Sequence, residues 1–168
     1  MAVRDDDPQP NRPGDVALGL VLVHVQFELL VALARAPRGW SVPVPVALRA
    51  GGLGLGGVLV MFTSAFALRR GLTAAPLPNR HAQLRTGGLY ALVRHPIYTG
   101  LLIATAALVV LAGGALRLGV WLALLVLING KARWEERHLA ARFPGYRAYA
   151  AQTPRFLPRL RPRGPQRG

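Results

Sequence analysis

The sequence predicts an all-α, polytopic membrane protein with about four transmembrane helices and a cytoplasmic, helical C-terminal region. Hydrophobic residues make up 52% of the 168 residues, charged residues only 17%, and the mean hydropathy is +0.30. The apolar residues fall into four separate runs, and a bilayer core of about 30 Å needs roughly 20 residues at about 1.5 Å each. Basic residues gather beside these runs, a pattern that sets membrane orientation.

Changes in composition predict the domain boundaries. Residues 1–14 are polar and rich in Pro and Asp, which predicts a disordered N-terminal tail. The membrane domain is expected over 15–158, followed by a basic tail at 159–168 that is rich in Arg and Pro. The chain has no cysteine, which excludes disulfides and thiolate metal sites. We expect no metal site.

The first span is expected at 16–34 and contains three polar side chains, His24, Gln26 and Glu28. Polar groups inside a span usually face the interior of the helix bundle. His24 and Glu28 lie four residues apart and therefore share one face. Two interpretations stay open for this pair, a mutually satisfied contact between helices and a substrate or proton site.

The other spans are expected at 46–68, 96–112 and 116–130. Five glycines between 51 and 57 would let the second span approach a neighbour closely, as small residues do in lipid. The third and fourth runs are short and are separated by two glycines, which predicts a tight or tilted hairpin. The helical pattern continues beyond the fourth run to about residue 142.

The charge distribution predicts the orientation. The chain has 21 Lys and Arg against 7 Asp and Glu, a net charge of +14. Four spans place both termini on one side, together with the connection 69–94, and this side then carries most of the positive charge. The positive-inside rule makes that side cytoplasmic. Because the basic residues flank apolar segments, we expect contact with membrane lipids and no nucleic-acid partner.

One short segment before the third span combines residues that suit an anion. Pro96 fits the first turn of a helix, so His95 lies beside free backbone N–H groups and the positive end of the helix dipole. Arg94 adds a fixed cation, and Tyr90 and Tyr98 offer aromatic faces and hydroxyls. The alternative is an interfacial cap, with arginine and tyrosine at the level of the lipid head groups.

A second segment supplies two adjacent carboxylates, Glu135 and Glu136, although the only other acidic residue after position 15 is Glu28. They lie about two helical turns beyond Ile128, which places them at the same depth as the segment around His95. Carboxylates can accept hydrogen bonds from ribose hydroxyls and favour a sulfonium cation nearby. The alternative is a solvated charged face with ion pairs along the helix.

These residues carry a resemblance. RHPIYTG, with its lead-in GGLYALV, resembles the Arg-His-Pro-x-Tyr-x-Gly signature of the isoprenylcysteine carboxyl methyltransferase and phospholipid methyltransferase family. The later segment EERHLAARFPGYRAYAAQTPRFLP resembles that family's Glu-Glu block. The resemblance covers about residues 81–158, and the two segments occur in the family's order, separated by one apolar hairpin. Pro144 departs from the pattern because it stands between Phe143 and Gly145.

The resemblance implies an integral membrane enzyme that uses S-adenosylmethionine, bound at the cytoplasmic face between segments 81–100 and 131–158. It implies a lipophilic acceptor such as a prenylcysteine-like carboxylate or a phospholipid amine, whose variable pocket would involve the first two spans, including Arg49. Arg94 and His95 would be the catalytic residues. The implied cofactor-binding residues are Leu84, Arg85, Tyr90, His95, Pro96, Tyr98, Gly100, Glu135 and Glu136.

Two alternatives from other classes stay open. Sterol reductases that use NADPH also contain an Arg-His-Pro-x-Tyr pattern, although the short chain and the adjacent glutamates favour the methyltransferase. A non-enzymatic four-helix membrane protein is the third interpretation. Neither the methyl acceptor nor the oligomeric state follows from the sequence.

Overall fold

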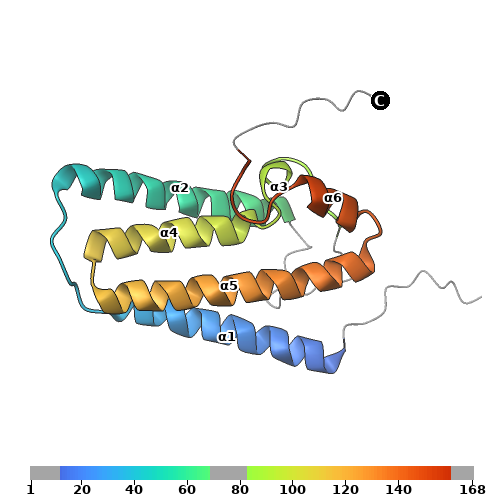
Figure 1. The fold of residues 1–168 in the computed structure, drawn as a ribbon, viewed down its shortest axis with the longest axis horizontal. Coiled ribbons are helices and arrows are strands. Elements are labelled where there is room, and N and C mark those ends of the chain that lie inside the picture. Colours follow the sequence, from blue (N-terminus) through green and yellow to red (C-terminus); the bar gives the residue numbers. More distant parts are fainter. Residues whose placement is uncertain (1–11, 69–82, 160–168) are drawn as a thin grey trace, which may run out of the picture.

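The computed structural model describes residues 12–68 and 83–159, and all regular secondary structure in this part of the chain is helical. Four long helices lie side by side in one bundle, and two short helices lie at one end of it (Figure 1). The predicted all-α fold is therefore confirmed. The helices are α1 (Pro13–Arg35), α2 (Val44–Leu68), α3 (Leu89–Leu92), α4 (Pro96–Ala112), α5 (Ala115–Arg142) and α6 (Tyr146–Gln152).

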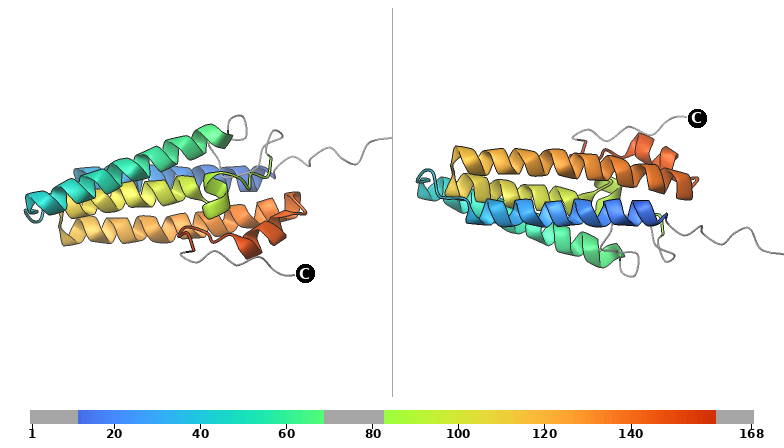
Figure 2. Two further views of the ribbon diagram at one scale, coloured as in Figure 1. Left: turned by 90° about the horizontal axis from the view of Figure 1, so that it is seen from above. Right: turned by 90° about the horizontal axis from the view of Figure 1, so that it is seen from below.

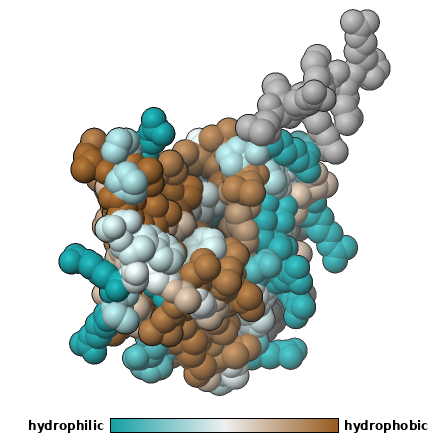
Figure 3. Space-filling model, turned by 60° about the vertical axis from the view of Figure 1, so that its left-hand side comes forward, coloured by the Kyte–Doolittle hydropathy of each residue, from teal (hydrophilic) through white to brown (hydrophobic). Residues whose placement is uncertain are grey.

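The lengths and compositions of the long helices fit a membrane protein. Among the described residues, α1, α2 and α5 are long and apolar enough to cross a bilayer, whereas α4 is apolar but has only 17 residues. Large hydrophobic areas lie open on the bundle surface (Figure 3), and many large apolar side chains are exposed, Val126 by 73% among them. The helices thus present to their surroundings the surface that lipid would cover.

Helix α5 extends beyond the apolar layer, as the sequence predicts. Its apolar part ends near Gly130, and residues 131–142 carry six charged side chains. This last part of α5 therefore lies outside the hydrocarbon layer. Helices α3 and α6 and both ends of the described chain lie at the same end of the bundle (Figures 1 and 2).

Two glycines make the turn at the opposite end. Gly113 and Gly114 have φ angles of 62° and 100°, which side chains with a Cβ rarely adopt. The Trp40 ring lies directly on Gly113, so that a Cβ there would come within 2.2 Å of the ring. Gly39 N–H donates to Ala112 O at 3.0 Å. The predicted helical hairpin is confirmed, and the α1–α2 loop closes over it.

Helices α2 and α4 touch backbone to backbone. A Cβ added at Gly100 would lie 2.4 Å from Gly57 O and 2.7 Å from Met61 N. Close approach through small residues is a common way to pair helices in lipid. Of the glycines expected to serve this purpose, Gly57 and Gly54 contact α4, whereas Gly51 has nothing within 4 Å.

Helix α1 packs on α5 with one face only. Leu33 is fully buried, and Lys131 Nζ on α5 donates to Gln26 Oε1 at 2.7 Å. The prediction that polar groups of the first span face the bundle interior is right for Gln26 and wrong for His24 and Glu28. Their side chains are 75% and 67% exposed, because they lie on the opposite face of the helix.

The predicted tails and the first part of the 69–94 connection lie largely outside the described residues, which exclude 1–11, 69–82 and 160–168. At the N-terminus α1 already begins at Pro13, so positions 13 and 14 belong to the helix rather than to the tail. Proline is favoured in the first turn of a helix, which explains this earlier start.

Candidate active site

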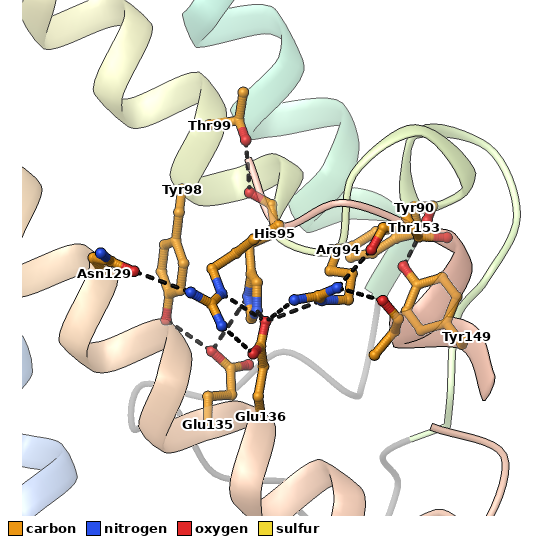
Figure 4. A network of polar contacts seen from close by, with 12 residues as sticks. Tyr90, Arg94, His95, Tyr98, Thr99, Asn129, Glu135, Glu136, Tyr149 and Thr153 are labelled. Carbon is orange, nitrogen blue, oxygen red and sulfur yellow. Dashed lines mark hydrogen bonds and ion pairs between the residues drawn. The ribbon is translucent and has the colours of Figure 1, made fainter. Parts of the chain in front are cut away.

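Segments distant in the sequence meet at the end of the bundle that carries α3 and α6. The start of α4, the charged end of α5 and the chain around α6 contribute polar side chains that point toward one another (Figure 4). The C-terminal segment runs across the start of α4, where Arg94 N–H donates to Pro154 O at 2.9 Å and His95 N–H donates to Arg155 O at 3.1 Å. The hydroxyl of Thr99 donates to Phe156 O at 2.9 Å. These bonds fix the C-terminal segment against α4.

Glu136 is the centre of this network. Arg94 Nε donates to Glu136 Oε1 at 3.0 Å, and Arg155 donates through Nε at 2.9 Å and through Nη2 at 2.6 Å. His95 Nε2 lies 3.1 Å from the same Oε1. Burial alone would raise the pKa of Glu136, but the hydrogen bonds from His95, Arg155 and Arg94 outweigh it and hold that pKa well below its usual range. Glu136 is therefore a fixed anion.

Glu135, the next residue, has a different environment. The Tyr98 hydroxyl donates to Glu135 Oε2 at 3.0 Å, and His95 Nδ1 lies 3.8 Å from that oxygen. Burial raises the pKa of Glu135, although His95, the Tyr98 hydrogen bond and Lys131 act in the opposite direction. The side chain keeps 25% of its surface exposed. Of the two carboxylates, Glu135 retains more capacity to accept bonds from a ligand.

Aromatic rings form one wall beside these carboxylates. The His95 ring stacks on Tyr98 with centroids 5.4 Å apart and an interplanar angle of 11°. Lys131 Nζ lies 5.3 Å from the centroid of the Tyr98 ring. His95 is 6% exposed, so hydrogen bonds and ring contacts hold its imidazole on several sides.

A further set of bonds holds Arg94 and α3 in place. Arg94 Nη1 donates to Ala150 O at 2.7 Å and to Thr153 O at 2.5 Å. The Tyr149 hydroxyl donates to Tyr90 O at 2.5 Å, and burial raises the pKa of Tyr149 to about 12, so this donor stays protonated. Arg94 thus connects α5 with the chain around α6.

A wide surface cavity of about 570 Å³, largely open to its surroundings, lies beside this network. Small-molecule sites are commonly about 300–1,000 Å³. Five arginines, one glutamate, one tyrosine and three alanines line it: Arg94, Arg133, Arg137, Arg147, Arg155, Glu136, Tyr146, Ala140, Ala150 and Ala151. The cavity therefore favours a ligand that carries an anionic group.

A family model described as phospholipid methyltransferase matches residues 48–145, more than half of the chain. The chain belongs to the phospholipid methyltransferase family. It is also similar to the cobalt-zinc-cadmium resistance protein CzcN of Cupriavidus metallidurans, with 29% identity over 142 residues. That alignment covers 84% of this chain and 62% of CzcN, so the chain spans less than two thirds of this relative's length.

The structure brings together five of the residues that the resemblance to this family predicts for the site. Direct side-chain contacts join Arg94, His95, Tyr98, Glu135 and Glu136. Their roles toward a ligand stay predictions.

The other residues that the resemblance predicts for the site lie outside that network. Tyr90 donates its hydroxyl to Ser64 O at 3.3 Å, and Pro96 is fully buried at the start of α4. Gly100 faces α2, where its lack of a side chain serves helix packing. Arg85 is exposed, and Leu84 lies near the turn before α6.

Sequence reasoning missed Arg155 and Lys131. Arg155 makes the bidentate contact with Glu136 and also donates to Asn129 Oδ1 at 3.1 Å. It lies inside the second family segment, directly before Phe156, but the pattern alone did not indicate which arginine returns to the glutamates. Lys131 is the single lysine among 21 basic residues, and that rarity was a usable signal. Its side chain is buried between Gln26 and Tyr98.

Proposed function

We propose that this membrane methyltransferase transfers a methyl group from S-adenosylmethionine to a lipophilic acceptor at the cytoplasmic membrane surface. The observation that carries the proposal is the direct contact between the start of α4 and the two glutamates of α5. Arg94 and His95 lie 2.9 Å and 3.1 Å from Glu136, and these segments are about forty positions apart in the chain. The contact lies just beyond the apolar part of α5, beside a cavity of suitable size.

The residues around the cavity fit the cofactor's charges. S-adenosylmethionine carries a carboxylate, an ammonium group, a sulfonium centre and ribose hydroxyls. Among the described residues, Arg133, Arg137 and Arg147 line the cavity, are exposed, and could bind the carboxylate. Glu135 does not line the cavity but is adjacent in α5 to Glu136, which does, and we assign Glu135 to the ribose or to a cationic group. Arg94 and Arg155 donate to Glu136 instead, so we assign them to holding the site together.

The protein itself needs to supply orientation and exclusion of water. S-adenosylmethionine, when bound, supplies a methyl carbon that its sulfonium already activates. Fixing two reactants in line accounts for much of the barrier reduction in such reactions. The stacked rings of His95 and Tyr98 give a rigid surface, and Glu135 beside them favours positive charge. We propose His95, held by both glutamates, as the residue nearest the reacting atoms.

The orientation of the protein is part of the proposal. The site, α3, α6 and both ends of the described chain lie at one end of the bundle (Figure 1). Most arginines of the described residues that lie outside the apolar helices belong to that end, and the positive-inside rule makes it cytoplasmic. Substrate and water-soluble cofactor then meet at the boundary of the bilayer, where an acceptor can enter between helices from the lipid.

Ligand-dependent thermal unfolding of the purified protein in detergent tests the cofactor. S-adenosylhomocysteine at 100 times its Kd should stabilise the fold by about 2.7 kcal/mol, and NADPH should have no effect. Glu135→Ala should abolish the shift, and Arg38→Ala should leave it unchanged, because Arg38 is exposed in the loop at the opposite end of the bundle. A shift with NADPH alone would show a reductase. No shift with either ligand would favour a non-enzymatic protein.

A labelled-methyl assay on membranes tests the reaction. Membranes that contain the protein are incubated with methyl-labelled S-adenosylmethionine, and lipids are extracted and separated. We expect label in a lipophilic product with wild-type protein and none with Glu135→Ala. Label that appears only in water-soluble products would contradict a lipophilic acceptor.

A further inference from the structure

A polar pair lies in the middle of α1, on its outer face. Helix α1 has 23 residues, and His24 stands at its centre, equally far from Pro13 and Arg35. His24 Nε2 lies 3.8 Å from Glu28 Oε1, one helical turn along. The two side chains are 75% and 67% exposed. In a bilayer this is the depth at which uncovered ionisable groups are most costly.

Nothing in the described part of the bundle covers this pair. The opposite face of α1 makes the intramolecular contacts, with Gly19 and Leu33 buried and Gln26 bonded to Lys131. At about 100° per residue, His24 and Glu28 point away from those three positions. The active-site network lies at the cytoplasmic end of the bundle and does not use them.

The residues around the pair have the spacing of a helix–helix seam. Positions 17, 21, 24, 28, 31 and 35 follow steps of 4, 3, 4, 3 and 4, and all six are exposed. This is the a/d spacing of two helices that pack in parallel with a slight left-handed crossing. Val21 and Val31 flank the pair and are 57% and 43% exposed. The seam thus has apolar ends and a polar centre.

We infer that this seam binds the same seam of a second copy of the chain. Two copies inserted in the same orientation have parallel α1 helices with equivalent residues at equal depth. In a parallel pair, the side chain of one a position inserts beside the d position one turn earlier in the other helix. Glu28 of each copy then faces Glu28 of the other at the same depth and also lies beside the other copy's His24, so that two acids and two bases form one cluster around the two-fold axis.

This charge complementarity distinguishes a second copy from lipid or an unrelated helix. Two seams together bring two acids and two bases within reach of one another, whereas lipid tails offer neither acid nor base. Interhelical polar contacts of this kind stabilise association in bilayers. The inference concerns assembly and is independent of the proposed cofactor.

Cysteine cross-linking in native membranes tests the inference, because the wild-type chain has no cysteine. Val21→Cys and Val31→Cys should form disulfide-linked dimers of this chain upon mild oxidation. Val126→Cys on α5 is the matched control, since it is 73% exposed but lies on another helix, and it should form at least about tenfold less dimer. Equal cross-linking at Val21 and Val126 would indicate random collision and overturn the inference.

A second set of variants tests the role of the polar pair. His24→Leu or Glu28→Leu in the Val21→Cys background should weaken association by about 3- to 30-fold, the range expected from an interhelical polar contact. The double variant His24→Leu/Glu28→Leu should associate no more weakly than either single variant. Unchanged dimer yield, or cross-links only to a different protein, would overturn the inference. Cooperative thermal unfolding of the same variants in detergent, without any ligand, is the control that they are folded.

Discussion

The molecule contains two histidine–glutamate pairs with opposite surroundings. His24 and Glu28 belong to one helix, lie 3.8 Å apart and are mostly exposed. His95 directly precedes α4 and Glu136 belongs to α5; they lie 3.1 Å apart and have side chains only 6% and 14% exposed. The difference shows that a histidine beside a glutamate is not by itself enough to form a ligand site. A site forms where other donors enclose the pair.

The enclosing donors explain what each pair can do. Glu136 accepts bonds from Arg94 and Arg155 as well as from His95, so it connects α4, α5 and the C-terminal segment. The pair on α1 connects only two successive turns of the same helix. Changes at His95 or Glu136 should therefore affect the whole end of the bundle that carries α3 and α6. Changes at His24 or Glu28 should affect only what lies against α1.

The largest effect is expected from Glu136→Gln, which removes the charge but keeps the shape. Arg94, Arg155 and His95 would lose their common acceptor. Breaking a buried ion pair on one side costs about 3–5 kcal/mol. We expect a large fall in the melting temperature in detergent and loss of the shift with S-adenosylhomocysteine.

Glu28→Gln is the matched control for that variant, because it makes the same chemical change in the exposed pair. We expect it to keep the full ligand-dependent shift. Equal loss of this shift in both variants would contradict the distinction between the two pairs, since it would mean that α1 takes part in ligand binding.

The next effect concerns Arg155, the donor that makes two bonds to Glu136. Hydrogen bonds to charged groups contribute about 1.5–3 kcal/mol, so Arg155→Ala should destabilise this end of the bundle by about that amount and thereby weaken S-adenosylhomocysteine binding. Arg155→Lys should not restore binding, because a lysine cannot make the bidentate contact. Titration calorimetry measures both. Full rescue by lysine would show that only the charge matters.

The sequence predicted which distant side chains meet better than it predicted which polar side chains are exposed. Arg94, His95, Glu135 and Glu136 stand in recognisable segments, and a helix begun by Pro96 fixes the direction of His95. Span positions followed from hydropathy alone. Both predictions depend only on neighbouring residues in the sequence, so they need no knowledge of how distant segments pack.

The missed features depend on packing between distant segments. Whether His24 or Gln26 faces α5 depends on the rotation of α1, and one helix with polar residues at 24, 26 and 28 allows either. The return of Arg155 to Glu136 depends on the path of the chain after α6. Gly100 fits the family segment, but its contact with Gly57 of α2 appears only in three dimensions.

A smaller effect is expected from a change in helix packing, which tests whether the His95–Glu136 pair depends on the contact between α2 and α4. Gly100→Ala would place a Cβ 2.4 Å from Gly57 O, and overpacking of this kind costs about 1–3 kcal/mol. We expect a lower melting temperature and a weaker ligand response, because α4 carries His95. Gly51→Ala, with nothing within 4 Å, should be neutral or slightly stabilising. Thermal unfolding of both variants decides whether the α2–α4 contact supports the site.

The smallest effect concerns acid, and its sign differs between the adjacent glutamates. Glu136 has a lowered pKa in the folded protein, so its contribution to stability is complete above the usual 4.5 and is lost as the pH falls below it. Glu135 has a raised pKa, so its contribution is present below 4.5 and is lost as the pH rises through its folded pKa. Between pH 6 and pH 4, the melting-temperature advantage of wild type over Glu136→Gln should therefore shrink. Over the same interval the difference between wild type and Glu135→Gln should move in favour of wild type. Parallel trends in the two variants would show that both carboxylates share one environment, and the contrast between a fixed anion and an available carboxylate would then fail.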